Sequence, residues 1–175
     1  MVGPPEVIGP ASPQAFVPYQ RGRFATQLPA DCLYTTAHVW VARHAEGVWR
    51  VGLTQFATRM LGETVDHGFE IEPGAGVRAG QKLGWVEGFK AISELLSPCE
   101  GTFVGGNPRL KQAIELLHQD PYGQGWLCLI EGKPDPGCVR AQAYTGILDA
   151  ALQALEREHS QGRSDEGGVC PPGTD

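Results

Sequence analysis

Short apolar runs separated by glycine, proline and other turn residues dominate the chain between residues 28 and 158. Val39 to Ala42 and Val48 to Leu53 flank the turn-like sequence "HAEG", which is typical of a β-hairpin. Further short strands are expected in "ETVDHGFEI", "QKLGWVEG", "AISELLS", "GTFVGG" and "WLCLI". The pattern predicts a small, turn-rich β core.

Three helices are expected beside these strands. Thr54 is a good N-cap residue for "QFATRML", and Gly62 is placed to end that helix. Asn107 and Pro108 begin "NPRLKQAIELLHQ", in which the leucines and isoleucine recur at helical spacing. The sequence "CVRAQAYTGILDAALQALEREH" has one apolar face and predicts a long C-terminal helix. The fold class is therefore a β-rich α+β fold with short helices and a C-terminal helix.

The two ends differ in composition from the middle of the chain. Proline and glycine crowd residues 1–22, and "HSQGRSDEGGVCPPGTD" at 159–175 has almost no apolar residues. Such segments cannot bury enough apolar surface to offset the entropy of ordering. We expect a disordered N-terminal extension at 1–27, one domain at 28–158 and a disordered tail at 159–175.

Charge and composition exclude several classes of protein. The net charge is -6 and the 14 lysine and arginine residues are dispersed, which argues against binding of nucleic acid. No apolar run has the roughly 18–20 residues that span a bilayer, and the N-terminus lacks a signal-peptide pattern. Five scattered cysteines without a CxxC pair indicate reduced thiols rather than disulfides or a zinc cage. We expect a cytoplasmic protein without membrane contact.

No motif for self-contained catalysis is present. The sequence "GAGVRAG" at 74–80 has the wrong spacing for a dinucleotide loop and is not followed by a long helix. The five histidines do not fall in HxxxH or HExxH spacing, so no metal site is expected, and no GxSxG elbow occurs. The residues alone leave Lys90, in "VEGFKA", as the remaining candidate. A lysine beside a hairpin turn is by itself an ordinary solvated charge.

An ordered set of motifs changes the interpretation of Lys90. The motifs are "HVW" at 38–40, "VGLTQFA" at 51–57, "LGE" at 61–63, "GWVEGFKA" at 84–91, "SPCEG" at 97–101, "NPRL" at 107–110 and "DPYGQGWL" at 120–127. In order and approximate spacing the sequence resembles the H protein of the glycine cleavage system, a lipoyl carrier. The resemblance extends from "LPADCLYTTAHVWV" to about Leu155, roughly three quarters of the chain.

The resemblance implies a flattened β-sandwich, or barrel-sandwich hybrid, of the biotinyl/lipoyl type with the modified lysine at the tip of a tight hairpin. Lys90 matches the lysine that carries N6-linked lipoate, and Glu87 matches the acidic residue that helps lipoylating enzymes recognise the hairpin. A biotin carrier would have methionines beside the lysine, where this chain has Phe89 and Ala91. The implied cofactor is therefore lipoate on Lys90.

The resemblance also implies a carrier that is not itself an enzyme. A PLP-dependent glycine decarboxylase would load an aminomethyl group onto the arm, and a tetrahydrofolate-dependent aminomethyltransferase would remove it. A dihydrolipoyl dehydrogenase would then reoxidise the dithiol. The arm would fold into a sheltering cleft, which we place near His38, with Trp40 and residues 63–66 as walls.

Several positions depart from the family's usual pattern. Gly88 and Phe89 stand where a serine and a small aliphatic residue are usual, Val39 replaces an acidic residue, and His118 replaces an asparagine. The usual "PEVG" turn is "EPGAG" at 72–76. Two alternatives therefore stay open: an H-like lipoate-binding protein that serves another pathway, such as bacterial sulfur oxidation, and an unmodified β-sandwich that acts only as an interaction module.

Overall fold

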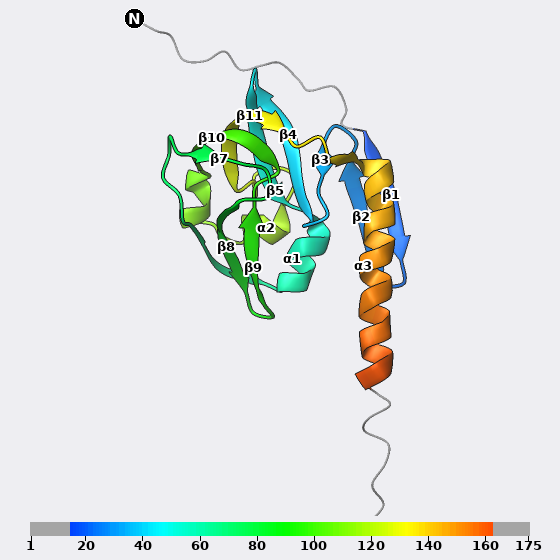
Figure 1. The fold of residues 1–175 in the computed structure, drawn as a ribbon. Coiled ribbons are helices and arrows are strands. Elements are labelled where there is room, and N and C mark those ends of the chain that lie inside the picture. The colour runs from blue at the N-terminus through cyan, green and yellow to red at the C-terminus, as the bar shows by residue number, and fades with distance from the viewer. Residues whose placement is uncertain (1–14, 163–175) are drawn as a thin grey trace, which may run out of the picture.

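The computed structural model describes residues 15–162, and residues 1–14 and 163–175 lie outside the described part (Figure 1). The strands are β1 Phe16–Arg21, β2 Phe24–Pro29, β3 Leu33–Tyr34, β4 Val39–Ala45, β5 Val48–Leu53, β6 Thr64–Phe69, β7 Gly76–Val77, β8 Lys82–Gly88, β9 Ile92–Leu96, β10 Cys99–Gly106, β11 Cys128–Pro134 and β12 Val139–Arg140. The helices are α1 Gln55–Leu61, the 3₁₀ helix η1 Pro108–Lys111, α2 Leu116–Gln119 and α3 Ala141–Gly162.

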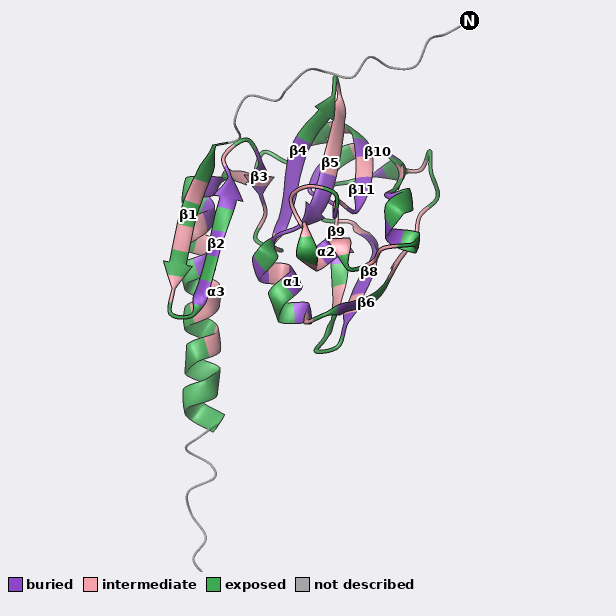
Figure 2. Cartoon of the chain, turned by 180° about the vertical axis from the view of Figure 1, so that it is seen from behind, coloured by how far each residue is buried: buried purple, intermediate pink, exposed green. Residues whose placement is uncertain are grey.

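Two antiparallel sheets enclose the main core. The larger sheet has the strand order β12-β3-β4-β5-β11-β10-β7, and the smaller has the order β6-β8-β9. One buried cluster lies between the sheets and includes Val51, Leu83, Leu95, Phe103 and Ile130. Figure 2 shows buried residues in strands of both sheets. The predicted β-rich sandwich with short helices and a C-terminal helix is confirmed.

Helix α1 has the two ends that the sequence predicts. Thr54 Oγ1 accepts a hydrogen bond from the Ala57 N–H at 3.3 Å, which caps the N-terminus. The helix ends at Leu61, and Gly62 follows with φ +76°, a conformation that glycine adopts without strain. Both signals are local in sequence, so the helix is found where the sequence places it.

The helix expected over 107–119 is divided in two. Asn107 caps η1 through its side-chain oxygen, which accepts from the Arg109 N–H, but the Asn107 amide group also donates to the carbonyls of Gln124 and Trp126. These contacts fix the start of the segment against the following loop. Residues 112–115 then turn before α2 begins at Leu116. Tertiary contacts therefore replace one continuous helix with two short ones.

The structure corrects the expected boundaries of the N-terminal extension and the tail. Residues 16–29 form the β1–β2 hairpin, which turns at Gly22 with φ +56°. Its alternate residues Phe24, Thr26 and Leu28 are buried, so the segment is not a disordered extension. At the other end, α3 continues to Gly162, beyond the expected start of the tail at 159. The rest of both segments lies outside the described residues.

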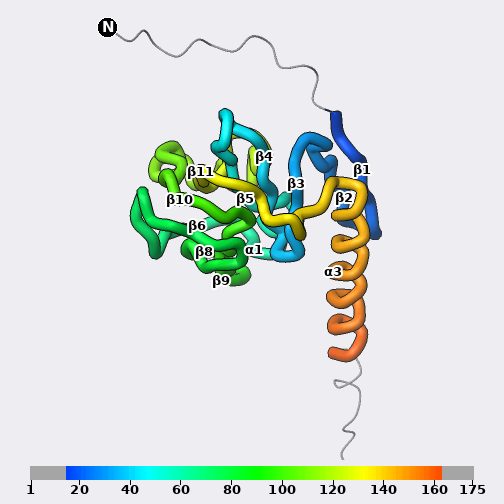
Figure 3. Tube along the Cα trace, turned by 45° about the horizontal axis from the view of Figure 1, so that its top comes forward, coloured from blue at the N-terminus to red at the C-terminus, as the bar shows by residue number. Residues whose placement is uncertain are grey.

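The hairpin and α3 form an appended module, defined here as β1, β2 and α3, on one side of the sandwich (Figures 1 and 3). A second buried cluster joins this module to the sandwich. Tyr34 of β3 stacks on Tyr144 of α3 with ring centroids 4.6 Å apart, and Leu28 and Leu148 are fully buried nearby in the same cluster. The C-terminal part of α3 projects past the sandwich (Figure 3).

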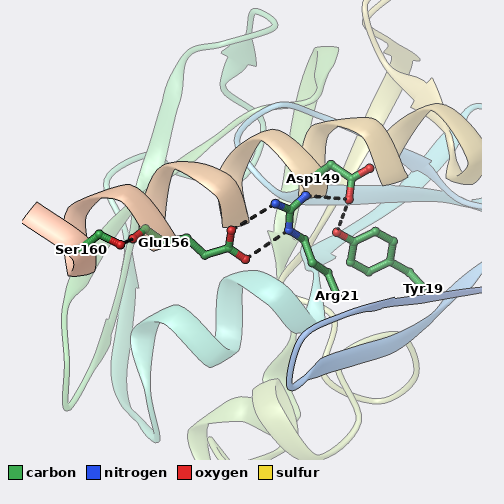
Figure 4. Close-up of polar contacts among 5 residues, drawn as sticks. All are labelled: Tyr19, Arg21, Asp149, Glu156 and Ser160. Carbon is green, nitrogen blue, oxygen red and sulfur yellow. Dashed lines mark hydrogen bonds and ion pairs between the residues drawn. The ribbon is translucent and has the colours of Figure 1, made fainter.

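Polar contacts on the module surface connect β1 to α3 (Figure 4). Tyr19 Oη donates to Asp149 Oδ1 at 2.7 Å, and the Arg21 guanidinium donates to both carboxylate oxygens of Glu156 at 3.3 and 3.1 Å. These groups are solvent-exposed, so the pairs contribute little to the free energy of folding. Burial of the apolar face of the hairpin is therefore the main contribution to its docking.

No helix in residues 15–162 combines the length and apolar character needed to cross a membrane.

Candidate functional site

Lys90 lies at the tip of the hairpin that β8 and β9 form. The two strands pair antiparallel as far as Glu87 and Ile92, and the Gly88 N–H donates to the Ala91 carbonyl at 2.9 Å. Phe89 and Lys90 are the two residues that reverse the chain. The turn predicted from the sequence thus places the lysine at the outermost point of the smaller sheet.

The C-terminal end of α1 holds this turn in place. The Lys90 N–H donates to the Leu61 carbonyl at 2.9 Å, and the Phe89 N–H donates to the Glu63 carbonyl at 3.0 Å. Gly88 allows this close approach, because a Cβ atom there would lie 2.7 Å from the Leu61 carbonyl carbon and 3.0 Å from Leu61 Cβ. The turn that carries Lys90 is therefore held by a second element and is not a free loop tip.

The Lys90 side chain is exposed, and its stem passes over Gly62. A Cβ atom on Gly62 would lie 3.0 Å from Lys90 Cγ. Lys90 has no ion pair within the described residues, whereas the Lys82 ammonium lies 3.3 Å from Glu70 and 3.5 Å from Glu94. Lys82 is thus a structural lysine, and the Lys90 amine is free to react.

Lys90 also lines a shallow pocket of about 430 Å³, here called the lysine pocket. The other residues that line it are Gln55, Thr58, Arg59, Gly62, Glu63 and His118. Most of these side chains come from α1 and its C-terminal end, so the helix that clamps the turn also forms the pocket wall.

Large exposed apolar side chains gather around the turn. Phe89 is 76% exposed and Ile92 is 67% exposed, and Met60 at the end of α1 and Val65 on β6 are also exposed. These four residues are here called the apolar collar. Exposed apolar surface at one place on a protein often marks an interaction site.

The structure does not bring His38 to the lysine pocket. His38 lies before β4 with φ +60°, its ring is 4.5 Å from the Phe56 ring, and its Nδ1 lies 2.8 Å from the Tyr144 hydroxyl. Burial lowers its pKa. Trp40 is fully buried and its indole N–H donates to the carbonyls of Leu53 and Pro121.

Trp40 is therefore corrected as a cleft wall, whereas the cleft near His38 stays a prediction. Trp40 packs in the core and has no exposed surface with which to form a wall. Of the expected wall residues 63–66, Glu63 does line the lysine pocket, whereas Asp66 lines a different pocket, next to Phe69 and Lys111. Lys90 and Glu63 are the expected residues that the structure brings together.

Glu87 lies on β8 three residues before Lys90 and is partly exposed. Its register partner on one side is Ile92 of β9, and on the other side it is Asp66 of β6. A protein that binds the β8–β9 hairpin can therefore contact the Glu87 carboxylate and Lys90 at the same time.

Two parts of the site were not identified from the sequence. The first is the pair of hydrogen bonds that the Leu61 and Glu63 carbonyls accept from the turn. The sequence signal for it is Gly62, which lies between them with a positive φ. The second is the pocket contribution of Gln55 and His118. In the sequence, the only signal at His118 is its departure from the family's usual asparagine.

Metal-binding clusters, cysteine thiols and the Lys90 amine are the groups of the described residues that bear on chemistry. No cluster of three or more histidine, cysteine, aspartate or glutamate residues in 15–162 is arranged to hold a metal ion. Burial raises the pKa of the Cys32 and Cys99 thiols to about 12, so neither is a thiolate at neutral pH. An exposed primary amine without an ion-pair partner is a suitable group for acylation.

Sequence and structural comparisons identify related proteins. The family model described as "Glycine cleavage H-protein" matches residues 32–141. The glycine cleavage system H protein of Mycobacterium avium (strain 104) is 37% identical over 125 residues, which cover 71% of this chain and 92% of that protein. The H protein of Thermobifida fusca (strain YX) is 41% identical over 126 residues, which cover 70% of this chain and 96% of that protein.

A solved structure agrees with the sequence matches. The crystal structure of a glycine cleavage system H protein from Mycobacterium marinum aligns with a TM-score of 0.62 and 34% identity, over 68% of this chain and 97% of that one. The family match begins after the β1–β2 hairpin and ends at the first residue of α3, so the appended module lies almost wholly outside it. Within residues 32–141 the sandwich, the clamped turn and Lys90 are all included, and the chain belongs to the glycine cleavage H-protein family.

Proposed function

We propose that this chain is the lipoylated carrier of a glycine cleavage system, with lipoate joined to Lys90 through an amide. The observation that supports it is the exposed Lys90 amine, without an ion pair in the described structure, on a turn clamped by the end of α1. Family membership gives the chemistry, because lipoate is the group that the family's lysine carries. The chain itself is then a carrier subunit and not an enzyme.

The residues of this chain would divide the work between a rigid base and a flexible arm. The hydrogen bonds from the Phe89 and Lys90 N–H groups hold the base, and the four-carbon lysine stem supplies the first part of the arm. When the amide forms, the Lys90 nitrogen loses its positive charge and becomes a neutral hydrogen-bond donor. The bound lipoate supplies a dithiolane that accepts and releases the aminomethyl group.

Glu87 is proposed as the carboxylate that lipoylating enzymes recognise. It lies on the β8–β9 hairpin with the lysine and remains partly exposed. The proposed partners of the modified chain are a PLP-dependent glycine decarboxylase, an aminomethyltransferase and a dihydrolipoyl dehydrogenase, in the cytoplasm. Each of them would have to admit the turn and the apolar collar at its entrance.

A second candidate is an H-like lipoate carrier for another lipoate-dependent pathway. Its support is Phe89, which is 76% exposed beside the attachment point where a smaller aliphatic residue is usual in the family. An aromatic ring at this position gives partners a different contact surface. Both candidates place lipoate on Lys90, so they differ in partner and not in modification.

Intact-mass measurement tests the attachment. Protein produced in a host that synthesises lipoate should carry the mass of one lipoyl group, and Lys90→Arg should lose it. Lys82→Arg is the matched control, because Lys82 lies on the same hairpin but is paired with Glu70 and Glu94. A lipoyl mass that persists in Lys90→Arg would refute the assignment.

Reconstitution distinguishes the two candidates. Lipoylated protein, combined with a glycine decarboxylase, should support the glycine-dependent exchange of the carboxyl group with bicarbonate. Free lipoamide at the same concentration is the control for a carrier that contributes nothing. Exchange no faster than with free lipoamide would refute the glycine cleavage carrier and favour the second candidate.

A further inference from the structure

Helix α1 is in contact with the appended module at both of its ends. At its start, Thr54 Oγ1 lies 3.0 Å from the Tyr144 hydroxyl of α3. The Phe56 ring packs edge-on against Phe24 of β2, with ring centroids 5.7 Å apart. In the last turn of the helix, the Arg59 guanidinium lies 5.4 Å from the centroid of the same Phe24 ring. The module therefore borders the helix whose C-terminal end holds the lysine turn.

These contacts belong to the appended module and not to the matched part of the family. Phe24 precedes residue 32 and Tyr144 follows residue 141, so both lie outside the segment that the family model matches. Helix α1 has seven residues, and a helix of this length depends on tertiary contacts for its stability. The position of the Leu61 carbonyl, which accepts from the Lys90 N–H, therefore depends on what packs against α1.

A chain of hydrogen bonds leads from His38 to the start of α1. His38 Nδ1 lies 2.8 Å from the Tyr144 hydroxyl, which in turn lies 3.0 Å from Thr54 Oγ1. Thr54 Oγ1 also accepts from the Ala57 N–H as the N-cap of the helix. Tyr144 and Thr54 are fully buried, so bulk water cannot replace a partner that either hydroxyl loses.

One placement of the protons satisfies the whole chain. Each hydroxyl has a single proton to donate. When His38 is neutral and carries its proton on Nε2, its Nδ1 accepts from the Tyr144 hydroxyl. Tyr144 Oη then accepts from the Thr54 hydroxyl, and Thr54 Oγ1 remains the acceptor for the Ala57 N–H. This assignment of protons follows from the network, because it leaves neither hydroxyl proton without an acceptor.

Protonation of His38 reverses the direction of the chain. The imidazolium carries a proton on Nδ1, which must donate to Tyr144 Oη. The Tyr144 hydroxyl then donates to Thr54 Oγ1, and the Thr54 hydroxyl proton loses its acceptor among the described residues. A rotation of the Thr54 side chain relieves this conflict but takes Oγ1 away from the Ala57 N–H. The charge on His38 is thus transmitted to the N-cap of α1.

The surroundings of His38 are uncharged in the described part of the chain. Its ring packs on the Phe56 ring of α1 at 4.5 Å, and Tyr144 of α3 is the titratable group that faces it. Burial raises the pKa of Tyr144, so this hydroxyl stays neutral. The backbone groups of His38 pair with those of Thr35 and Thr54. Burial lowers the pKa of His38 below its ordinary value of about 6.5.

We propose that Tyr144 of the appended module is a positioning residue for the lysine turn. Its hydroxyl couples the protonation of His38 to the N-cap of α1, and α1 transmits the change to the Lys90 N–H through the Leu61 carbonyl. With His38 neutral the turn is held, and with His38 protonated α1 shifts and the turn loosens. The effect on acylation of Lys90 rests on the proposed lipoylation, whereas the effect on the turn does not.

Two tyrosine-to-phenylalanine variants test the proposal. Tyr144→Phe removes the hydroxyl and keeps the ring that stacks on Tyr34. Tyr34→Phe is the matched control, because Tyr34 is the other ring of the stacked pair and its buried hydroxyl donates to the Pro29 carbonyl at 2.7 Å. Each variant loses one buried hydroxyl, but the Tyr34 hydroxyl does not contact the cap of α1 in the described structure.

His38→Asn separates the charge of His38 from its hydrogen bond. Asparagine tolerates the φ of +60° at this position, and its side-chain oxygen can accept from the Tyr144 hydroxyl without titrating between pH 5 and 7.5. This variant should keep the wild-type protection of the Phe89 and Lys90 amides at pH 7.5. It should also remove the response of these amides to pH that follows His38.

The first readout is NMR of the chain without lipoate between pH 7.5 and 5. In the wild type and Tyr34→Phe, the Phe89 and Lys90 amide shifts should titrate with the midpoint of the His38 ring. Their protection factors against hydrogen exchange should fall at least about fivefold on the acid side, the size of one N-cap interaction. In Tyr144→Phe the component that follows His38 should vanish, whereas any shift that follows His67 should stay.

The second readout is acylation at pH 7.5 by a lipoylating enzyme. Tyr144→Phe should raise the KM of that enzyme for the chain roughly fivefold, because a smaller fraction of the chain has the turn in the held arrangement. The kcat should not change, since the Lys90 amine itself is unaltered. Tyr34→Phe should keep the wild-type KM.

The outcomes separate this inference from the proposed function. Wild-type Phe89 and Lys90 amides that do not follow His38 would refute the positioning role, as would equal losses of protection in Tyr144→Phe and Tyr34→Phe. The wild-type titration and His38→Asn decide the question even if Tyr144→Phe fails to fold. A chain that never gains the lipoyl mass refutes the lipoylation of Lys90 and leaves the amide measurements valid.

Discussion

Gly88→Ala should distort the lysine turn, because the added methyl group would collide with the backbone at the end of α1. The new Cβ would lie 2.7 Å from the Leu61 carbonyl carbon, where ordinary carbon–carbon contacts are about 3.5–4.0 Å. The neighbour is backbone at the end of α1, so the turn must retreat by about 1 Å. The Lys90 N–H to Leu61 carbonyl distance, now 2.9 Å, would then exceed hydrogen-bonding range.

The magnitude follows from the bonds that break. The Phe89 N–H to Glu63 carbonyl bond belongs to the same contact and should be lost with the Lys90 bond. At about 1 kcal/mol for each net hydrogen bond, the free energy of unfolding should fall by about 2 kcal/mol. For a chain of this size the melting temperature should fall by about 4–8 °C.

Urea unfolding of matched variants measures this effect. Gly146 lies in α3, and a Cβ atom there meets nothing within 4 Å, so Gly146→Ala should stabilise the helix by up to about 1 kcal/mol. The same substitution should therefore have opposite signs at the two positions. Hydrogen exchange at the Phe89 and Lys90 amides should become faster in Gly88→Ala only. Unchanged stability with unchanged amide protection would refute the clamp.

Three other predictions concern pH, the apolar collar and the appended module. Burial lowers the pKa of His38 and is also the main cause that lowers the pKa of His67. The neutral forms therefore favour folding, and the free energy of unfolding should decrease as the pH falls below about 6.5. Urea midpoints measured from pH 7.5 to 5 test the direction of this change. His67→Gln should make the dependence of stability on pH less steep. Phe89→Ser should keep the free energy of unfolding within about 0.5 kcal/mol of the wild-type value. It should raise the KM of the glycine decarboxylase for the lipoylated carrier roughly fivefold. An unchanged KM would show that the Phe89 ring is not part of the interface. Leu28→Ala should lower the unfolding free energy by about 2–5 kcal/mol, because Leu28 is fully buried. Arg21→Ala should lower it much less, because its ion pairs are exposed. Urea unfolding measures both, and the reverse order would mean that ion pairs hold the hairpin.

Features with local causes could be predicted from the sequence. Thr54 and Gly62 define α1 because an N-cap hydroxyl and a positive-φ glycine act within one helical turn. The position of Lys90 at a hairpin turn could be predicted, because the turn lies between two strand-like runs and within an ordered set of motifs. The clamp on the turn could not, since the Leu61 and Glu63 carbonyl oxygens are backbone groups that every residue type supplies.

Features with distant causes were predicted wrongly. The composition of 16–29, including Pro18 and Gly22, suggested disorder, but the hairpin is ordered by packing on α3 more than 100 residues away; Tyr19 and Asp149 are 130 positions apart. Trp40 was expected to form a wall of the arm cleft, but it is fully buried in the core cluster that α3 helps to form.

Helix α1 connects the appended module to the turn that carries Lys90. At its N-terminus, Thr54 Oγ1 lies 3.0 Å from the Tyr144 hydroxyl of α3 while it caps the helix. At its C-terminus, the Leu61 carbonyl accepts the hydrogen bond from the Lys90 N–H. The helix between them has seven residues, about 10 Å of rigid backbone. A shift of α3 against the sandwich therefore has a short structural path to the lysine turn, and the same helix forms one wall of the lysine pocket.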